Sequence, residues 1–430
     1  MPMRDMKVGW ILLALVGTAV CAAAQDAPPP SEPKPKVRFV WNDHPSIRAG
    51  VFRLDAHTQW HADSRRSEQD LADAGKTYQT ELKRVGVTGR ITHRIDFEVE
   101  RELRRHNPWR NVFVNVELAR ALEVRAGKFK MPFSHEELTG ITHLDFVYRT
   151  QLARIIAPAR EVGVMAHGQI VKRTIEYQAG WFRHDGENGA LREPIFLLPG
   201  ESPPKADRSV AARAVVEPLR HASGPRDIRR LYLGVAATWS HVPEGLNSLR
   251  GKSLFGSKFF EPVYVLGYRR RIGAEAMWLP GPAGIKAEYA RSNEQRSRQG
   301  LLDDDLSDFV TKGWYVSGTW LVTGERKDGG VEPRKPLFQK GFGAVEVGAR
   351  YDTISFGSVL NQGIAFDNPR ADPILGNSQN TWTVGVNWYL NKWGKVVVNG
   401  IREAFEDTGR TAIPGKRSGW SGVFRLQFAM

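Results

Sequence analysis

Apolar and polar residues alternate one by one, in segment after segment, from Ser46 to the last residue. This period of two is the feature that most constrains the fold, and residues 95–99 (IDFEV) and 382–388 (WTVGVNW) are examples. Successive side chains of a strand point to opposite faces, so each segment has one apolar face and one polar, often charged face. Helical periodicity is nearly absent, apart from a short helix expected within residues 135–156. The sequence therefore predicts an all-β protein.

Segments of this kind build either a soluble sandwich or propeller, or a barrel whose apolar face contacts lipid. Three features favour the transmembrane barrel. The final residues, 424–430, form an amphipathic strand suited to barrel closure. No repeat of blade length is visible, which disfavours a propeller. Aromatic residues recur at strand ends, as in the girdles at the two lipid–water interfaces; they are Trp60, Trp181, Trp239, Trp278, Trp314 and Trp388.

Turn chemistry supports the same architecture. Residues 280–284 (PGPAG) and the pair Lys172 and Arg173 predict tight turns. Long polar stretches alternate with these turns, which is the layout of an outer-membrane barrel with one short rim and one elaborate rim. The stretches are 61–82, 184–208, 241–258, 292–308, 325–340 and 353–380. We count about 15 candidate strands and expect 16 antiparallel strands, because single-chain bacterial barrels favour even numbers.

The N-terminus reads as an export signal. Arg4 and Lys7 precede an apolar stretch at residues 8–20, and the small residues 22–24 form a cleavage site. We expect a signal peptide at 1–24, a Pro-rich periplasmic segment at 25–45 and the barrel domain at 46–430. Cys21 is a less favoured alternative, as the acylation site of a lipoprotein. Cleavage after residue 24 would leave a mature chain without cysteine, which suits an oxidising compartment.

Charge and motifs narrow the function. Lys and Arg number 61 against 47 Asp and Glu, a net charge of +14, which favours an anionic partner. The basic residues are spread over many segments with acids between them, so nucleic-acid binding is disfavoured. Residues 135–139 (HEELT) lack the second histidine of a zinc-protease helix, and residues 245–253 (GLNSLRGKS) have the wrong glycine spacing for a phosphate loop.

No catalytic residue, metal ligand or cofactor is predicted, and the 11 histidines are scattered singly. A phospholipase-like barrel with a Ser/His pair remains an open alternative among enzymes, which are otherwise disfavoured. Outside enzymes, a barrel with long loops can also act without conducting, as an adhesive surface.

Six blocks, taken in order, resemble the phosphate-selective porin O and P family of Gram-negative outer membranes. They are residues 125–133 (RAGKFKMPF), 160–164 (REVGV), 313–325 (GWYVSGTWLVTGE), 343–351 (GAVEVGARY), 385–391 (GVNWYLN) and 425–428 (RLQF). The last residue is Met430, where outer-membrane strands of this type usually end in Phe. The resemblance implies a 16-stranded barrel in the outer membrane, usually trimeric, with a third long loop folded inward as a constriction.

The resemblance, joined to the polar faces, predicts a porin that conducts small anions by diffusion, with phosphate or polyphosphate as favoured solutes. A general porin with little ion selectivity is the alternative within transport. The predicted partners are inorganic anions, outer-membrane lipid, two further copies of the chain and the outer-membrane assembly machinery, with no nucleic acid.

Rings of Arg and Lys suit anion pores, so basic residues are the candidate site. The predicted constriction spans residues 127–160, and its candidate anion-binding residues are Arg125, Lys128, Lys130, Arg149, Arg154 and Arg160. The predicted pore-lining residues are Arg53, Arg94, Arg271, Lys286 and Arg350. Inward acids such as Asp55, Glu98 and Glu346 are expected to pair with some of them and to reduce their pull on anions.

Overall fold

The computed structural model describes residues 36–68, 78–103, 108–189, 206–225, 227–247, 249, 251–327, 330–358, 370–371, 373–413 and 415–430. The expected signal peptide at 1–24 and most of the expected Pro-rich segment lie outside the described residues. In the described part of the chain, no helix is long and apolar enough to cross a membrane.

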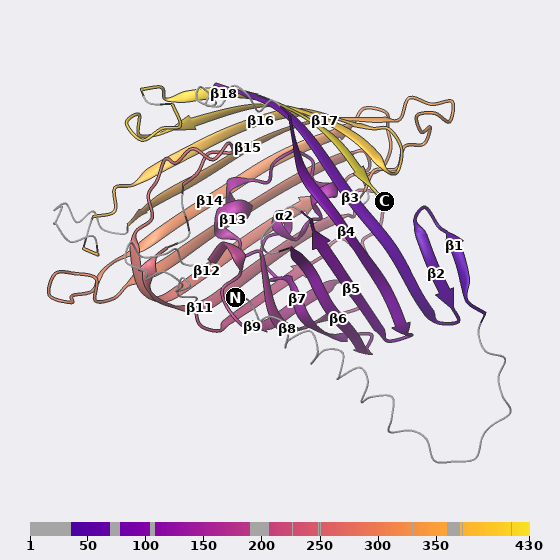
Figure 1. The fold of residues 1–430 in the computed structure, drawn as a ribbon, viewed down its shortest axis with the longest axis horizontal. Coiled ribbons are helices and arrows are strands. Elements are labelled where there is room, and N and C mark those ends of the chain that lie inside the picture. Colours follow the sequence, from indigo (N-terminus) through magenta and orange to yellow (C-terminus); the bar gives the residue numbers. More distant parts are fainter. Residues whose placement is uncertain are drawn as a thin grey trace, which may run out of the picture.

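Sixteen antiparallel strands, β3 to β18, form a closed barrel in the described chain (Figure 1). Each strand pairs with the next along the sequence, and β18 returns to pair with β3, for example at Arg425 opposite Asp63. The strands are β3 (Phe52–Ser67), β4 (Tyr78–Thr92), β5 (Ile95–Glu102), β6 (Trp109–Ala119), β7 (Leu122–Lys130), β8 (Arg160–Ile170), β9 (Ile175–Phe182), β10 (Ser209–Val216), β11 (Leu231–Leu246), β12 (Tyr264–Trp278), β13 (Ala283–Arg296), β14 (Leu306–Leu321), β15 (Ala344–Ser358), β16 (Asn377–Tyr389), β17 (Gly394–Phe405) and β18 (Ser418–Ala429). The predicted all-β barrel of 16 strands is confirmed.

The two faces of the wall have the opposite burial pattern to a soluble sheet. On β11, Trp239 is 54% exposed while its neighbour Thr238 is 4% exposed. On β14, Trp320 is 53% exposed and Thr319 is 7% exposed. Apolar side chains thus point outward, where a membrane supplies an apolar solvent, and polar side chains point into the barrel.

The predicted tight turns are present. Lys172 and Arg173 lie in the turn between β8 and β9, and Gly281 in the turn between β12 and β13 has a positive φ of 69°. Several polar stretches predicted as loops begin or end within strands instead. β3 continues to Ser67, so part of the predicted loop 61–82 is wall, because polar residues that face the lumen have the composition of a loop.

A hairpin precedes the barrel. It consists of β1 (Arg38–Trp41) and β2 (Pro45–Ala49), and β2 pairs with the start of β3 through Ser46 opposite Asp55. Paired structure therefore begins at Arg38, within the segment 25–45 that the sequence places before the barrel.

Between β7 and β8 the chain forms segment 131–159. This segment carries α2 (His135–Leu138), a 3-10 turn η1 (Ile141–His143) and a π-helical turn η2 (Leu152–Ile156), which match the helix expected within 135–156. A second short 3-10 turn, η3 (Glu187–Gly189), follows β9. The amide of Met131 donates to the carbonyl of Ala159 at 2.8 Å, so the two ends of the segment meet at the wall.

Candidate functional site

Segment 131–159 is attached to the polar side chains of the wall on β13 to β18. Asp145 accepts hydrogen bonds from Lys286 of β13 at 2.8 Å and from Lys327, which follows β14, at 2.7 Å. Lys395 of β17 donates to the carbonyl of Leu144 at 2.7 Å. Burial alone would raise the pKa of Asp145, but the two ammonium groups hold the pKa of this carboxyl well below its usual range. Asp145 is therefore a charged anchor.

A second anchor lies further along the segment. Arg350 of β15 donates to the carbonyl of Tyr148 at 3.0 Å and lies 3.4 Å from Glu136. Arg425 of β18 donates to the carbonyl of Val147 at 2.9 Å while forming a bidentate pair with Asp63, at 2.7 Å for each contact. These arginines stabilise the segment because each joins a backbone carbonyl to a carboxylate.

Apolar residues complete the attachment. Leu152 and Ile156 of η2 pack into a buried cluster with Phe309 of β14 and Phe356 of β15. Phe259 and Phe260, from the chain between β11 and β12, belong to the same cluster. Burial of apolar area is the main favourable term in such contacts, so charge and packing both hold this segment against one side of the wall.

Two of the predicted constriction cations stabilise α2. The Lys130 ammonium donates to the carbonyls of Glu137, Leu138 and Thr139, the last at 3.0 Å. The Arg149 guanidinium donates to the carbonyls of Glu136 and Thr139. The last carbonyls of a helix have no partner within the helix, and cations there also interact favourably with its dipole. Lys130 and Arg149 thus supply hydrogen-bond donors to the free carbonyl groups at the C-terminal end of α2.

Around this end of α2, basic side chains converge from four strands and the segment. We call them the basic cluster: Arg84, Arg110, Lys128, Lys130, Arg149 and Arg160. Their carboxylate partners in the described chain are Glu100 and Glu102 on β5, Glu137 on α2 and Glu187 on η3. Six cations thus face four carboxylates, and the cluster keeps a positive excess.

Arg160 contributes most directly to that excess. Its Nε donates to Asn111 at 2.8 Å, and within the described residues no carboxylate lies within ion-pair distance of it. Arg84 and Arg110 lie near enough to repel it electrostatically. Glu187 pairs with Arg110 at 3.1 Å and with Lys128 at 2.9 Å, so one carboxylate serves two cations.

The sequence predicted four of the six residues of the basic cluster. Lys128, Lys130, Arg149 and Arg160 were predicted for the constriction and lie together. Arg84 and Arg110 were missed, although Arg84 shares the inward parity of its strand and alternation could have indicated it. Their proximity depends on the pairing of β4 to β8, which a single sequence does not specify.

Two other predicted constriction residues lie apart from the cluster. Arg125 stacks on Phe113, with its guanidinium carbon 4.5 Å from the ring centroid. Arg154 of η2 donates to Gln151 at 3.2 Å, and burial lowers its pKa from the usual value. In the described part of the chain, neither has a carboxylate within ion-pair distance.

The predicted pore-lining residues differ in position. Lys286 and Arg350 contact segment 131–159, as described above. Arg271 is fully buried and pairs with Asp185 at 2.6 Å, so it is neutralised. Arg53 is exposed and pairs with Asp55 on its own strand. Arg94 lies in the exposed turn between β4 and β5 and is not part of the wall, because β4 ends at Thr92.

Segment 131–159 leaves open space beside it. A cavity of about 370 Å³ lies next to α2. It is lined by polar side chains, including His135 and Thr139 of the segment, Arg213 of β10, Glu275 of β12 and Tyr315 of β14. Its lining also includes apolar side chains such as Leu138 and Met277, so the cavity is of mixed polarity and of a size that suits a small solute.

Comparison with known proteins defines the class. The family model "Phosphate-selective porin O and P" matches residues 52–429. An uncharacterized protein of Caulobacter vibrioides is 23% identical over 406 residues, which cover 87% of this chain and 73% of that protein.

Three solved structures share the fold at low identity. OmpT, an outer membrane protein of Vibrio cholerae, has a TM-score of 0.55 at 10% identity, over 89% of this chain and 99% of that one. An anion-selective porin from Comamonas acidovorans has a TM-score of 0.53 at 12% identity, over 88% and 100%. The outer membrane channel DcaP of Acinetobacter baumannii has a TM-score of 0.52 at 10% identity, over 88% and 97%.

The closed barrel with an apolar outer face and a polar interior is therefore that of an outer-membrane porin, and its class is a channel rather than an enzyme. The chain belongs to the phosphate-selective porin O and P family, whose model matches from the first strand of the barrel almost to the last residue.

Proposed function

We propose that this porin conducts small anions selectively and that phosphate or polyphosphate is its favoured solute. The observation that carries the proposal is the positive excess of the basic cluster beside α2. Charges in a narrow, low-dielectric channel act strongly on a passing ion, and Arg grips phosphate through paired hydrogen bonds. The family name and the anion-selective porin of Comamonas acidovorans support the same reading.

Segment 131–159 is the proposed constriction. Residues of this segment contact side chains on the buried face of the wall, from β13 to β18. The basic cluster lies beside α2 of the same segment. With the segment held to one side, the solute path would pass between α2 and the opposite wall. Arg160 and Lys128 would act on the ion, while Lys130 and Arg149 would hold the constriction in shape.

Assembly and export complete the proposal. OmpT of Vibrio cholerae is described in a trimer form, which supports a homotrimer. The signal peptide at 1–24 would direct export, the assembly machinery would insert the barrel, and lipid would cover its apolar face.

Single-channel recording in planar bilayers tests the solute. With KCl on both sides, phosphate is titrated in while open-channel current is measured. Block of the chloride current by low phosphate concentrations supports the phosphate reading. A channel without phosphate effect would leave a general porin, and correctly folded barrels without channels would favour an adhesive role for the loops.

A further inference from the structure

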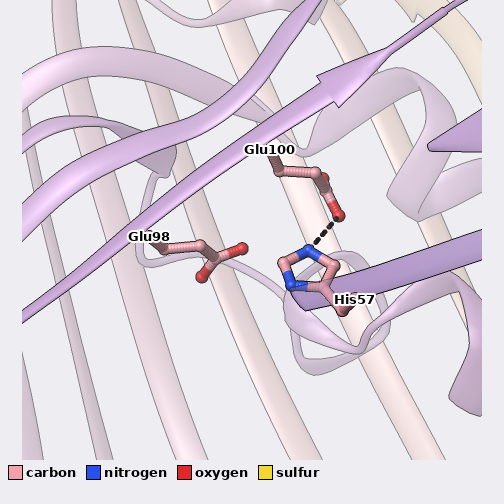
Figure 2. A group of neighbouring side chains, drawn as sticks. All are labelled: His57, Glu98 and Glu100. Carbon is pink, nitrogen blue, oxygen red and sulfur yellow. Dashed lines mark ion pairs between the residues drawn. The ribbon is translucent and has the colours of Figure 1, made fainter. Parts of the chain in front are cut away.

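One lumen-facing group of side chains lies beside the basic cluster, which it meets where Glu100 pairs with Arg84. His57 of β3 and Glu98 and Glu100 of β5 bring one ligand atom each to within 4.8 Å of one another (Figure 2). His57 and Glu98 are half-buried and Glu100 is buried. Imidazole nitrogen and carboxylate oxygen are ligands that zinc and similar divalent ions prefer in proteins.

We propose that His57, Glu98 and Glu100 form a binding site for a divalent transition-metal cation such as Zn²⁺. The sequence did not predict it, because 41 positions separate the histidine from the nearer glutamate. The site goes beyond the proposed anion conduction and does not rest on it.

The backbone between the two strands is shaped for this contact. Gly86 of β4 pairs with His57 on one side and with Glu100 on the other. A Cβ atom at Gly86 would lie 2.4 Å from His57 Nε2, so only glycine lets the imidazole lie across β4 toward the carboxylates. The ring is thereby placed over a strand that would otherwise separate the ligands.

The ligand distances suit an ion better than a hydrogen bond. His57 Nε2 lies 3.8 Å from Glu100 Oε2. With metal–ligand bonds of about 2.0–2.2 Å, two ligands of a tetrahedral site lie roughly 3.3–3.5 Å apart. A small closure of the side chains would therefore admit an ion, and water would take the remaining position.

The neighbouring cation does not block the site. Arg84 contacts Oε1 of Glu100 at 3.4 Å, whereas the His57 contact is to Oε2, and Arg84 also pairs with Glu102 at 3.0 Å. Glu98 accepts a hydrogen bond from Asn111 through Oε1 at 2.8 Å, leaving Oε2 to an ion. Such second contacts orient ligand carboxylates in metal sites.

Titration calorimetry with Zn²⁺ on the purified full-length porin in detergent tests the proposal. We expect one site per chain, with an affinity at least roughly tenfold weaker in His57→Gln and in Glu98→Gln. The matched control is His167→Gln, another inward histidine, which contacts Asn115 at 2.7 Å and has no place in this group. Its Zn²⁺ affinity should equal that of the wild type.

Co²⁺ offers a second readout, because its visible absorption reports ligand geometry. A Co²⁺ band in the wild type that is lost in Glu98→Gln supports the site, even if His57→Gln does not fold. Absence of Zn²⁺ binding to the wild type, or equal affinity in wild type and both variants, would overturn the proposal. Neither readout depends on whether the channel prefers anions.

Discussion

Lys286 donates a hydrogen bond to Asp145 at 2.8 Å and so joins the wall of the barrel to a segment 141 positions earlier in the chain. Both side chains are about nine-tenths buried. Removing one partner of a buried ion pair leaves an uncompensated charge, which is costly. The pair is therefore an anchor of the proposed constriction, and its loss should be measurable.

We expect Asp145→Asn to lower the free energy of unfolding by roughly 3–5 kcal/mol, because Lys286 is left as a buried cation with no ion-pair partner among the described residues. The variant should also show noisier single-channel current, since segment 131–159 is held less firmly. Denaturant unfolding and bilayer recording measure the two effects. Asp407→Asn is the control, because Asp407 pairs with Arg410 near the surface. Equal stability of Asp145→Asn and wild type would contradict the anchor.

Arg160→Gln should reduce anion preference. A unit charge about 8 Å from an ion acts with roughly 0.5–1 kcal/mol in a high-dielectric lumen, so the anion-to-cation permeability ratio should fall roughly two- to fivefold. Arg173→Gln, in the exposed turn between β8 and β9, is the matched control and should leave the ratio unchanged. Equal permeability ratios in the two variants would show that Arg160 does not contribute to anion preference.

Glu187→Gln should act in the opposite direction. It frees Arg110 and Lys128 from their shared carboxylate, so the anion-to-cation permeability ratio should rise by a similar factor. Reversal potentials under a salt gradient measure the change. An unchanged ratio would mean that these cations lie away from the ion path.

The same carboxyl predicts a pH dependence. Burial alone would raise the pKa of Glu187, but Arg110 and Lys128 outweigh it and lower the pKa below its usual value. Glu187 therefore stays ionised as pH falls through the ordinary range of about 4.3. Its contribution to stability is present above that range and is lost only as pH falls through the lower folded value.

The contribution of Glu187 to ion preference should accordingly stay constant from pH 7 to about pH 5 and be lost only below the ordinary carboxyl range of about 4.3. Reversal potentials across this range measure it. Other carboxyls also titrate in this range. The informative quantity is therefore the difference in reversal potential between wild type and Glu187→Gln at each pH. A wild-type rise already near pH 6 that is absent from Glu187→Gln would contradict the assignment.

Lys128→Glu and Lys130→Glu should both weaken phosphate block, for different reasons. Within the described residues Lys128 pairs with Glu187 at 2.9 Å and donates to no carbonyl, so its reversal changes the field and its structural cost is confined to repulsion of that one carboxylate. Lys130 donates to three carbonyls of α2, so its replacement should also disorder that turn and lower stability. Thermal unfolding beside the phosphate titration separates the two. Equal loss of stability in both variants would contradict the distinction.

The barrel could be predicted from the sequence because its determinants are local. Alternation sets which side chains face lipid, and residues 280–284 and Lys172 with Arg173 mark turns that the structure contains. The ends of strands were less certain, since inward polar residues such as His61 and Asp63 on β3 have the composition of a loop.

The site was predictable only in part, because its contacts are long-range. Residue type identified Lys128 and Arg160 as candidate cations. Nothing local indicates that Arg271 is neutralised by Asp185, 86 positions away. Nor does the sequence show that Lys130 and Arg149 end a helix rather than face the solute. Pairing across the barrel decides which cations keep their charge for an anion.

The reversal potential of the wild-type porin under a KCl gradient tests the central claim most directly. The positive excess of the basic cluster predicts a potential displaced toward that of chloride, and Arg160→Gln should move it back toward zero. A wild-type potential displaced toward that of potassium would contradict the claim that this porin selects anions.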